Sequence, residues 1–152
     1  MDLVFETTVA APIEEAFRFH ADPRSLSRLM EGRAGFLLLS PGTSVEPGSV
    51  TRVRVVLERV ISLEMEFLHG PWDPPRMFSE RQVRGPFRTF EHRHEFEARP
   101  GGTLIRDRIR VALPPLLGGG LATRLIVEPR LRREFAHRHE VLRRILGECA
   151  VS

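Results

Sequence analysis

Three polar residues with ionisable side chains interrupt the apolar faces of two adjacent strand-like segments between residues 85 and 113. Alternate side chains of a strand share a face, so His92 and His94 are predicted to lie beside Phe90 and Phe96. After a turn at residues 99–102, Asp107 falls on the apolar face of the next strand, with Ile105, Ile109 and Val111. Imidazole and carboxylate groups on a buried face can move a proton or bind a metal ion.

The turn also predicts how the two strands pair. If it is centred on Pro100 and Gly101, His94 lies opposite Asp107 and His92 lies opposite Ile109. The same register pairs Phe96 with Ile105, Glu95 with Arg106, Glu91 with Arg110, and Arg93 with Arg108. Most outer pairs then join opposite charges, which mildly stabilises a sheet.

Three kinds of chemistry are open to this histidine pair. Zinc could bind His92 and His94 if Asp107 or Glu80 supplied a third ligand. His94 oriented by Asp107 could act as a general acid or base, with His92 as a further catalytic candidate. The favoured interpretation is that both imidazoles line a cavity and form hydrogen bonds to Asp107 and water, so we expect no metal and no cofactor.

The surrounding chain predicts the elements that hold these residues. Alternating patterns predict strands near residues 3–9, 36–39, 50–57, 61–67 and 76–84, with a loop at 70–75. A helix follows Ala11-Pro12, and Asp22-Pro23 predicts the start of a second short helix. A long C-terminal helix is expected over residues 121–146, kinked or split by Pro129.

This order predicts an α+β fold with a curved antiparallel sheet of about seven strands wrapped around the C-terminal helix. Residues 1–152 are expected to form one domain with a cavity between sheet and helix. On the helices, His137 and His139 are expected at the surface, and His20 is expected to make a helix-end contact. The predicted ligand-binding residues are Met65, Phe78, Glu80, Gln82, Phe90, His92, His94, Phe96, Asp107, Ile109, Val111, Leu125 and Phe135.

Composition excludes several functional classes. The 152 residues are 41% hydrophobic and 28% charged, with a net charge of +3, as in ordinary globular proteins. The arginines alternate with acids instead of forming a basic stripe, so no nucleic-acid partner is expected. No apolar run approaches about 20 residues, so no membrane span is expected. Without a signal-peptide pattern, the expected location is the cytoplasm of a bacterium.

Several short motifs, in order, resemble a known superfamily. They are residues 11–17 (APIEEAF), 20–23 (HADP), 72–78 (WDPPRMF), 85–87 (GPF) and 101–103 (GGT), together with His92, His94, Phe96 and Asp107. The chain resembles the START-like (SRPBCC) superfamily, which includes polyketide cyclase/dehydrase-like proteins and the birch-pollen-allergen fold. The motifs are similar to those of one bacterial branch. The resemblance implies a helix-grip fold with a hydrophobic ligand cavity.

The resulting functional hypothesis is the binding or transport of a small hydrophobic ligand, such as a lipid, polyketide or isoprenoid-like molecule. One alternative is an enzyme of the polyketide cyclase/dehydrase type that uses His94 and Asp107 as acid and base. Another is a protein-interaction module that uses the helix or a loop. One fold supports all three, so the functional choice depends on the site.

Overall fold

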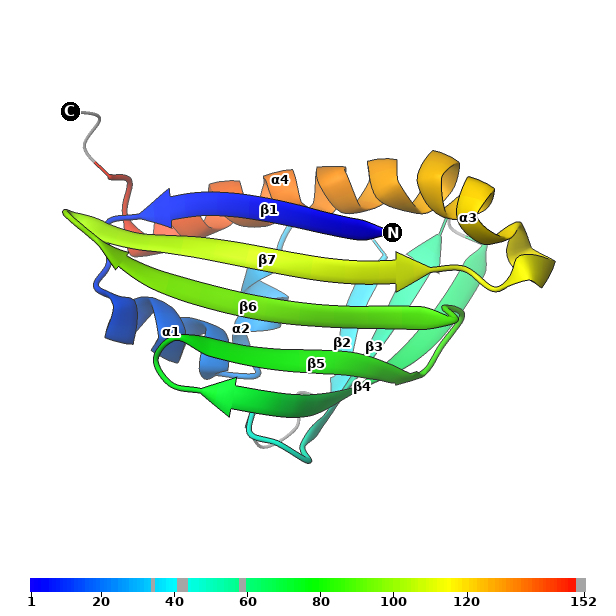
Figure 1. Cartoon of the computed structure of the whole chain (residues 1–152), viewed down its shortest axis with the longest axis horizontal. Coiled ribbons are helices and arrows are strands. Elements are labelled where there is room, and N and C mark those ends of the chain that lie inside the picture. The colour runs from blue at the N-terminus through cyan, green and yellow to red at the C-terminus, as the bar shows by residue number, and fades with distance from the viewer. Residues whose placement is uncertain (34, 41–43, 58–59, 150–152) are drawn as a thin grey trace.

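The computed structural model describes residues 1–33, 35–40, 44–57 and 60–149. Their strands form one antiparallel sheet in the order β1-β7-β6-β5-β4-β3-β2. Figure 1 shows the sheet curling so that β2 and β3 lie behind β5 and β6, while α4 runs along its length. The described part of the chain therefore has the predicted helix-grip architecture.

The elements follow the predicted sequence of one strand, two short helices, six strands and a C-terminal helical segment. The strands are β1 (Asp2–Val9), β2 (Phe36–Ser40), β3 (Val50–Leu57), β4 (Ile61–Asp73), β5 (Met77–Arg84), β6 (Thr89–Arg99) and β7 (Gly102–Ala112). The helices are α1 (Ile13–Ala21), α2 (Ser25–Leu29), the 3-10 turn η1 (Pro115–Leu117), α3 (Gly119–Ala122), the π-helical turn η2 (Thr123–Val127) and α4 (Glu128–Leu146).

The β6–β7 hairpin has the predicted register. His94 lies opposite Asp107, and His92 lies opposite Ile109. Gly101 in the connecting turn has a φ of +80°, a conformation that glycine adopts without steric cost. All the predicted outer pairs are also present, including Arg93 opposite Arg108. That like-charged pair is relieved by Glu95, which lies 3.2 Å from Arg93 and 3.0 Å from Arg108.

The C-terminal helical segment is divided close to the point that Pro129 predicts. The π-helical turn η2 precedes α4, and Pro129 occupies the first turn of α4, where its missing N–H has no cost. The extra residue in a π turn changes which side chains face the sheet. Leu125 is consequently 64% exposed, so its predicted inward orientation is wrong.

Two local boundaries also differ from the prediction. The expected loop at 70–75 is partly strand, because β4 continues beyond an irregularity after His69 and pairs Trp72 with Phe78. The second helix begins at Ser25 and not at Pro23. Asp22 instead accepts a hydrogen bond from the backbone N–H of Arg24 at 2.9 Å, which forms a turn between α1 and α2.

Two buried apolar clusters lie between the sheet and the helices. The first gathers residues of α1, the middle of the sheet and the end of α4, including Phe17, Phe78 and Phe96. The second lies near the start of α4, where Phe135 stacks on Phe5 with ring centroids 4.4 Å apart. Stacked aromatic rings add to the free energy gained by burying apolar area, so both clusters hold α4 against the sheet.

Candidate functional site

A cluster of ionisable side chains lies on the inner face of the sheet. Strand β5 contributes Glu80, β6 contributes His92 and His94, β7 contributes Asp107, and α4 contributes His139. Antiparallel pairing places Glu80 directly opposite His92, and alternation keeps all four strand residues on one face. We refer to these five residues as the inner-face cluster.

Asp107 is the centre of this cluster. Its Oδ1 accepts a hydrogen bond from His92 Nε2 at 2.9 Å and lies 2.8 Å from His94 Nδ1, although the latter contact is poorly aligned for a hydrogen bond. Its Oδ2 lies 3.5 Å from His139 Nε2. An isolated buried carboxylate is costly, so three surrounding imidazoles explain how Asp107 can remain only 3% exposed.

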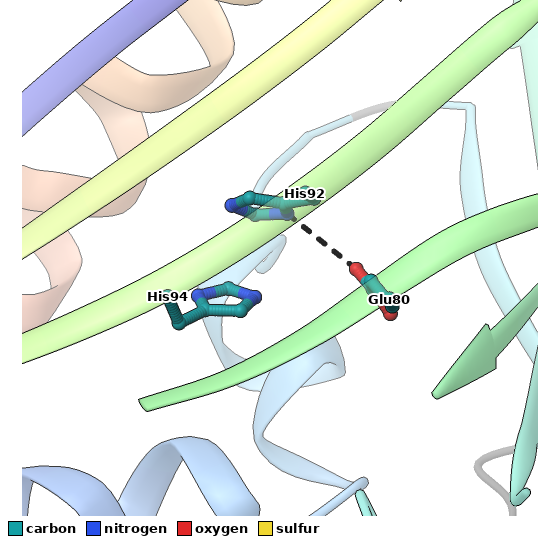
Figure 2. Close-up of side chains that lie close together, drawn as sticks. All are labelled: Glu80, His92 and His94. Atoms are coloured by element: carbon teal, nitrogen blue, oxygen red, sulfur yellow. Dashed lines mark ion pairs between the residues drawn. The ribbon is translucent and has the colours of Figure 1, made fainter. Parts of the chain in front are cut away.

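Glu80 approaches the cluster from the neighbouring strand. Its Oε1 lies 3.5 Å from His92 Nδ1, the ring nitrogen that does not face Asp107 (Figure 2). Its Oε2 lies 3.8 Å from Nε2 of His69, whose Nε2 is also 3.0 Å from the hydroxyl of Thr51. The Glu80 side chain is 18% exposed, so it is the most accessible acid of the cluster.

These contacts separate the pKa values of the two neighbouring histidines. Burial lowers the pKa of His92, but its contacts with Asp107 and Glu80 outweigh burial and raise that pKa above its ordinary value. Burial and the adjacent positive charge of His92 lower the pKa of His94 to about 4. In the absence of other ligands, one imidazole is therefore charged and the other is neutral near pH 6.

The pKa values of both acids are lowered. Burial alone would raise the pKa of Glu80, but its contact with His92 and the charges of His94 and His69 lower it to about 2. Burial would likewise raise the pKa of Asp107, which its histidine contacts hold well below the ordinary range. Both carboxylates are thus ionised at neutral pH and require positive partners.

His139 was predicted to lie at the surface, and this prediction is wrong. His139 is 8% exposed because it follows Phe135 by four residues on the inward stripe of α4. His69 was not singled out, although it continues the inward alternation of Met65 and Phe67. His20 makes the expected helix-end contact, with its Nδ1 2.8 Å from the carbonyl of Ala16.

The other predicted ligand-binding residues divide by burial. Five are buried: Phe78, Phe96, Ile109, Val111 and Phe135. Met65, Gln82 and Phe90 are partly buried, and Gln82 donates a hydrogen bond to the Phe87 carbonyl at 2.9 Å. Further partly accessible apolar residues share this face on paired strands β2, β3 and β4: Phe36, Leu38, Val55 and Leu63. The inner face beyond the cluster is thus an apolar surface that is not fully covered.

An open groove lies along the outer face of the sheet. It has a volume of about 640 Å³, and its lining includes Val4, Leu68 and Arg108. This groove is on the opposite side of the sheet from the space where the sequence predicts a cavity. The inner cavity stays a prediction. Any binding experiment must therefore distinguish the inner from the outer face.

Comparison with known proteins agrees with the fold and the order of motifs. Residues 9–140 match the family model described as polyketide cyclase / dehydrase and lipid transport. No curated protein matches. The chain therefore belongs to the polyketide cyclase/dehydrase and lipid transport family, in agreement with the resemblance deduced from the sequence.

Solved structures with the same fold include proteins of low sequence identity. Protein Ms6760 from Mycobacterium smegmatis is 15% identical with a TM-score of 0.71, over 95% of this chain and 90% of that one. TTHA0849 from Thermus thermophilus is 16% identical with a TM-score of 0.71, over 95% of this chain and 99% of that one. Ara h 8.0201 is 15% identical with a TM-score of 0.63, over 93% of this chain and 97% of that one. None of the helices in the described residues has the length and apolar character needed to cross a membrane.

Proposed function

We propose that this protein binds a small hydrophobic ligand, such as a lipid, polyketide or isoprenoid-like molecule, between the inner face of the sheet and the C-terminal helix. The observation that supports this most directly is the partly accessible apolar surface on the inner face, including Met65 and Phe90, beside buried polar groups. Ligand sites commonly combine apolar walls with a few polar groups that fix orientation. Membership of a family that includes lipid transport agrees with this function.

In this proposal, the inner-face cluster orients the polar end of the ligand. Glu80 is its most accessible acid, and it lies on the same face as Phe67 and Gln82. A hydroxyl or carbonyl group of a ligand would form hydrogen bonds there, while the apolar part would lie against Met65 and Phe90. The proposed cellular location is the bacterial cytoplasm.

Binding of the apolar fluorophore 1-anilinonaphthalene-8-sulfonate tests the proposal. We expect saturable binding that is strongly weakened by Met65→Glu, since this substitution places a charge on the inner face. Val4→Glu is the matched control, because Val4 is 47% exposed and lines the outer groove. Circular dichroism checks that both variants fold. Absence of saturable binding, or loss of binding only in Val4→Glu, would overturn the proposal.

The ligand itself can be identified from the natural source. Native mass spectrometry of the protein purified from its own host should show a bound species that is released on unfolding. An apolar molecule with one polar end is the expected result. A protein that carries no apolar molecule and also fails to bind the fluorophore would exclude the carrier function.

A second candidate is an enzyme that acts on the same class of ligand. The close contact between His94 and Asp107, at 2.8 Å, is the observation that favours it, because an acid that orients an imidazole is a common catalytic pair. Turnover of a bound ligand that is abolished by His94→Ala but retained in Met65→Ala would support catalysis. An unchanged ligand after prolonged incubation would support the carrier alone.

A further inference from the structure

Three ligand-type atoms of the inner-face cluster converge from two adjacent strands. Glu80 offers a carboxylate oxygen, and His92 and His94 each offer a ring nitrogen, with all three atoms within 4.8 Å of one another. His92 Nδ1 is 3.5 Å from Glu80 Oε1. Ligand atoms around a tetrahedral zinc ion are about 3.4 Å apart, given metal–ligand distances of about 2.0–2.2 Å. One pair therefore already has this spacing, and the atom of His94 lies within 4.8 Å of both others, so it would have to move closer to bind the same ion.

Asp107 decides which ring nitrogens are free to bind a metal. It accepts a hydrogen bond from His92 Nε2, so Nδ1 of His92 faces Glu80 and is the atom that would bind a metal ion, with release of its proton. It lies beside Nδ1 of His94 and so leaves Nε2 of His94 as the available atom. Figure 2 shows the His94 ring with a nitrogen on the side of Glu80. A carboxylate on the far nitrogen is the usual support of a metal-bound histidine.

This arrangement assigns different roles to the two acids. The sequence left open whether Asp107 or Glu80 would be a third ligand and favoured no metal. Asp107 is already occupied by the far sides of both imidazoles, whereas Glu80 lies on their near side. If a metal ion binds here, Glu80 would thus be the direct ligand, and Asp107 would be a positioning residue.

Charge and burial are also compatible with a cation at this point. A divalent ion would be neutralised by the carboxylates of Glu80 and Asp107, both of which are in the cluster. His139 Nε2 lies 3.5 Å from Asp107 Oδ2, and His69 Nε2 lies 3.8 Å from Glu80 Oε2. Each carboxylate therefore has a further imidazole beside it, in addition to His92 and His94.

We propose that Glu80, His92 and His94 form a binding site for a divalent transition-metal ion, with zinc as the expected occupant. Two imidazoles and one carboxylate suit zinc, and three protein ligands leave a coordination position open. That position could hold water or an oxygen atom of a bound ligand. The metal site stands on the geometry of the polar cluster and does not depend on the binding of an apolar ligand.

Metal titration of chelator-treated protein tests this site. We expect one equivalent of Zn²⁺ in isothermal titration calorimetry, and visible d–d absorption from Co²⁺ bound in the same position. Glu80→Gln and His94→Ala should each reduce the affinity by more than Asp107→Asn does, because they remove direct ligands. Asp107→Asn should weaken binding by about 10–100-fold while retaining one equivalent, as expected for a positioning residue.

His137→Ala is the matched control. His137 is also a histidine of α4, but it contacts the backbone carbonyl of Glu31 and lies outside the cluster. The affinity of the His137→Ala variant for Zn²⁺ should equal that of the unsubstituted protein. X-ray absorption of the unsubstituted zinc complex provides a second measurement that requires no variant, and two imidazoles in the metal shell are expected. The site would be overturned if neither ion bound, or if Glu80→Gln and His94→Ala bound Zn²⁺ as tightly as the unsubstituted protein.

Discussion

The contact between His92 and Asp107 should couple the effects of substituting these two residues. Their hydrogen bond is 2.9 Å long, and both side chains are at least 95% buried. A hydrogen bond that involves a charged group contributes about 1.5–3 kcal/mol, and removal of one buried partner leaves the other unsatisfied. We therefore expect His92→Ala and Asp107→Ala each to lower the free energy of unfolding by about 3 kcal/mol.

A double-mutant cycle measures how much of this loss in the free energy of unfolding comes from the interaction between His92 and Asp107. Urea unfolding of the two single variants and the double variant, in the presence of a chelator, should give a coupling energy of about 2 kcal/mol. A parallel cycle with His94→Ala should give a smaller coupling, because the His94–Asp107 contact is poorly aligned. In a domain of this size, 2 kcal/mol corresponds to roughly 4–8 °C in melting temperature.

Two results would refute this reasoning. If His92→Ala and Asp107→Ala add independently, the hydrogen bond does not stabilise the folded protein. If the coupling energy between His94 and Asp107 exceeds that between His92 and Asp107, the hydrogen-bond alignment does not determine the strength of these contacts. His137→Ala serves as the reference for removal of an imidazole outside the cluster, and it should show no coupling to Asp107.

Three further predictions concern acid stability and packing. The pKa of Glu80 is lowered to about 2, so the ionised carboxylate stabilises the folded protein above pH 4.5, and this stabilisation is lost as the pH falls toward 2. In urea unfolding of the metal-free protein, the free energy of unfolding should fall by about 3 kcal/mol over this pH range, and the Glu80→Gln variant should not show this fall. Phe135→Ala should cost about 3–5 kcal/mol in urea unfolding, because Phe135 is 3% exposed, whereas Leu116→Ala, at 95% exposure, should change stability by less than about 0.5 kcal/mol. Gly102→Ala should lower the melting temperature, since its Cβ would overlap the Val9 carbonyl oxygen; an unchanged melting temperature would show that β1 can move aside.

Local patterns were sufficient to predict the most informative part of the molecule. In the β6–β7 hairpin, strand alternation and one turn determine the pairing of His94 with Asp107. The physical reason is that a short turn leaves few alternative registers, and a slip of one residue would bury the arginines. The helix-grip class followed from the order of elements and from the resemblance.

The parts that were missed depend on contacts between distant segments. His139 belongs to the cluster only because α4 crosses the sheet at Asp107, and no pattern within the helix gives that crossing point. Leu125 was misplaced because a π-helical turn changes the phase of the segment before α4. The role of Glu80 could be stated only as an option, since the strand face of β5 was ambiguous until its pairing with β6 was known.

The position of β1 in the sheet has a consequence for synthesis on the ribosome. β1 precedes the other described strands in sequence, but among them it pairs with β7 alone, so Asp2 lies opposite Arg110. The strands from β2 to β7 pair as successive hairpins with short connections, whereas closing the β1–β7 pair requires about a hundred residues of intervening chain.

At a translation rate of about 5–20 residues per second, β1 therefore waits roughly 5–20 s for its partner. During that time its apolar positions Leu3, Phe5 and Val9 are without their β7 neighbours. The acids Asp2 and Glu6 on its other face later pair with Arg110 and Arg106. Until then, their charge disfavours association of the nascent strand with other chains, because charged residues discourage edge-to-edge pairing.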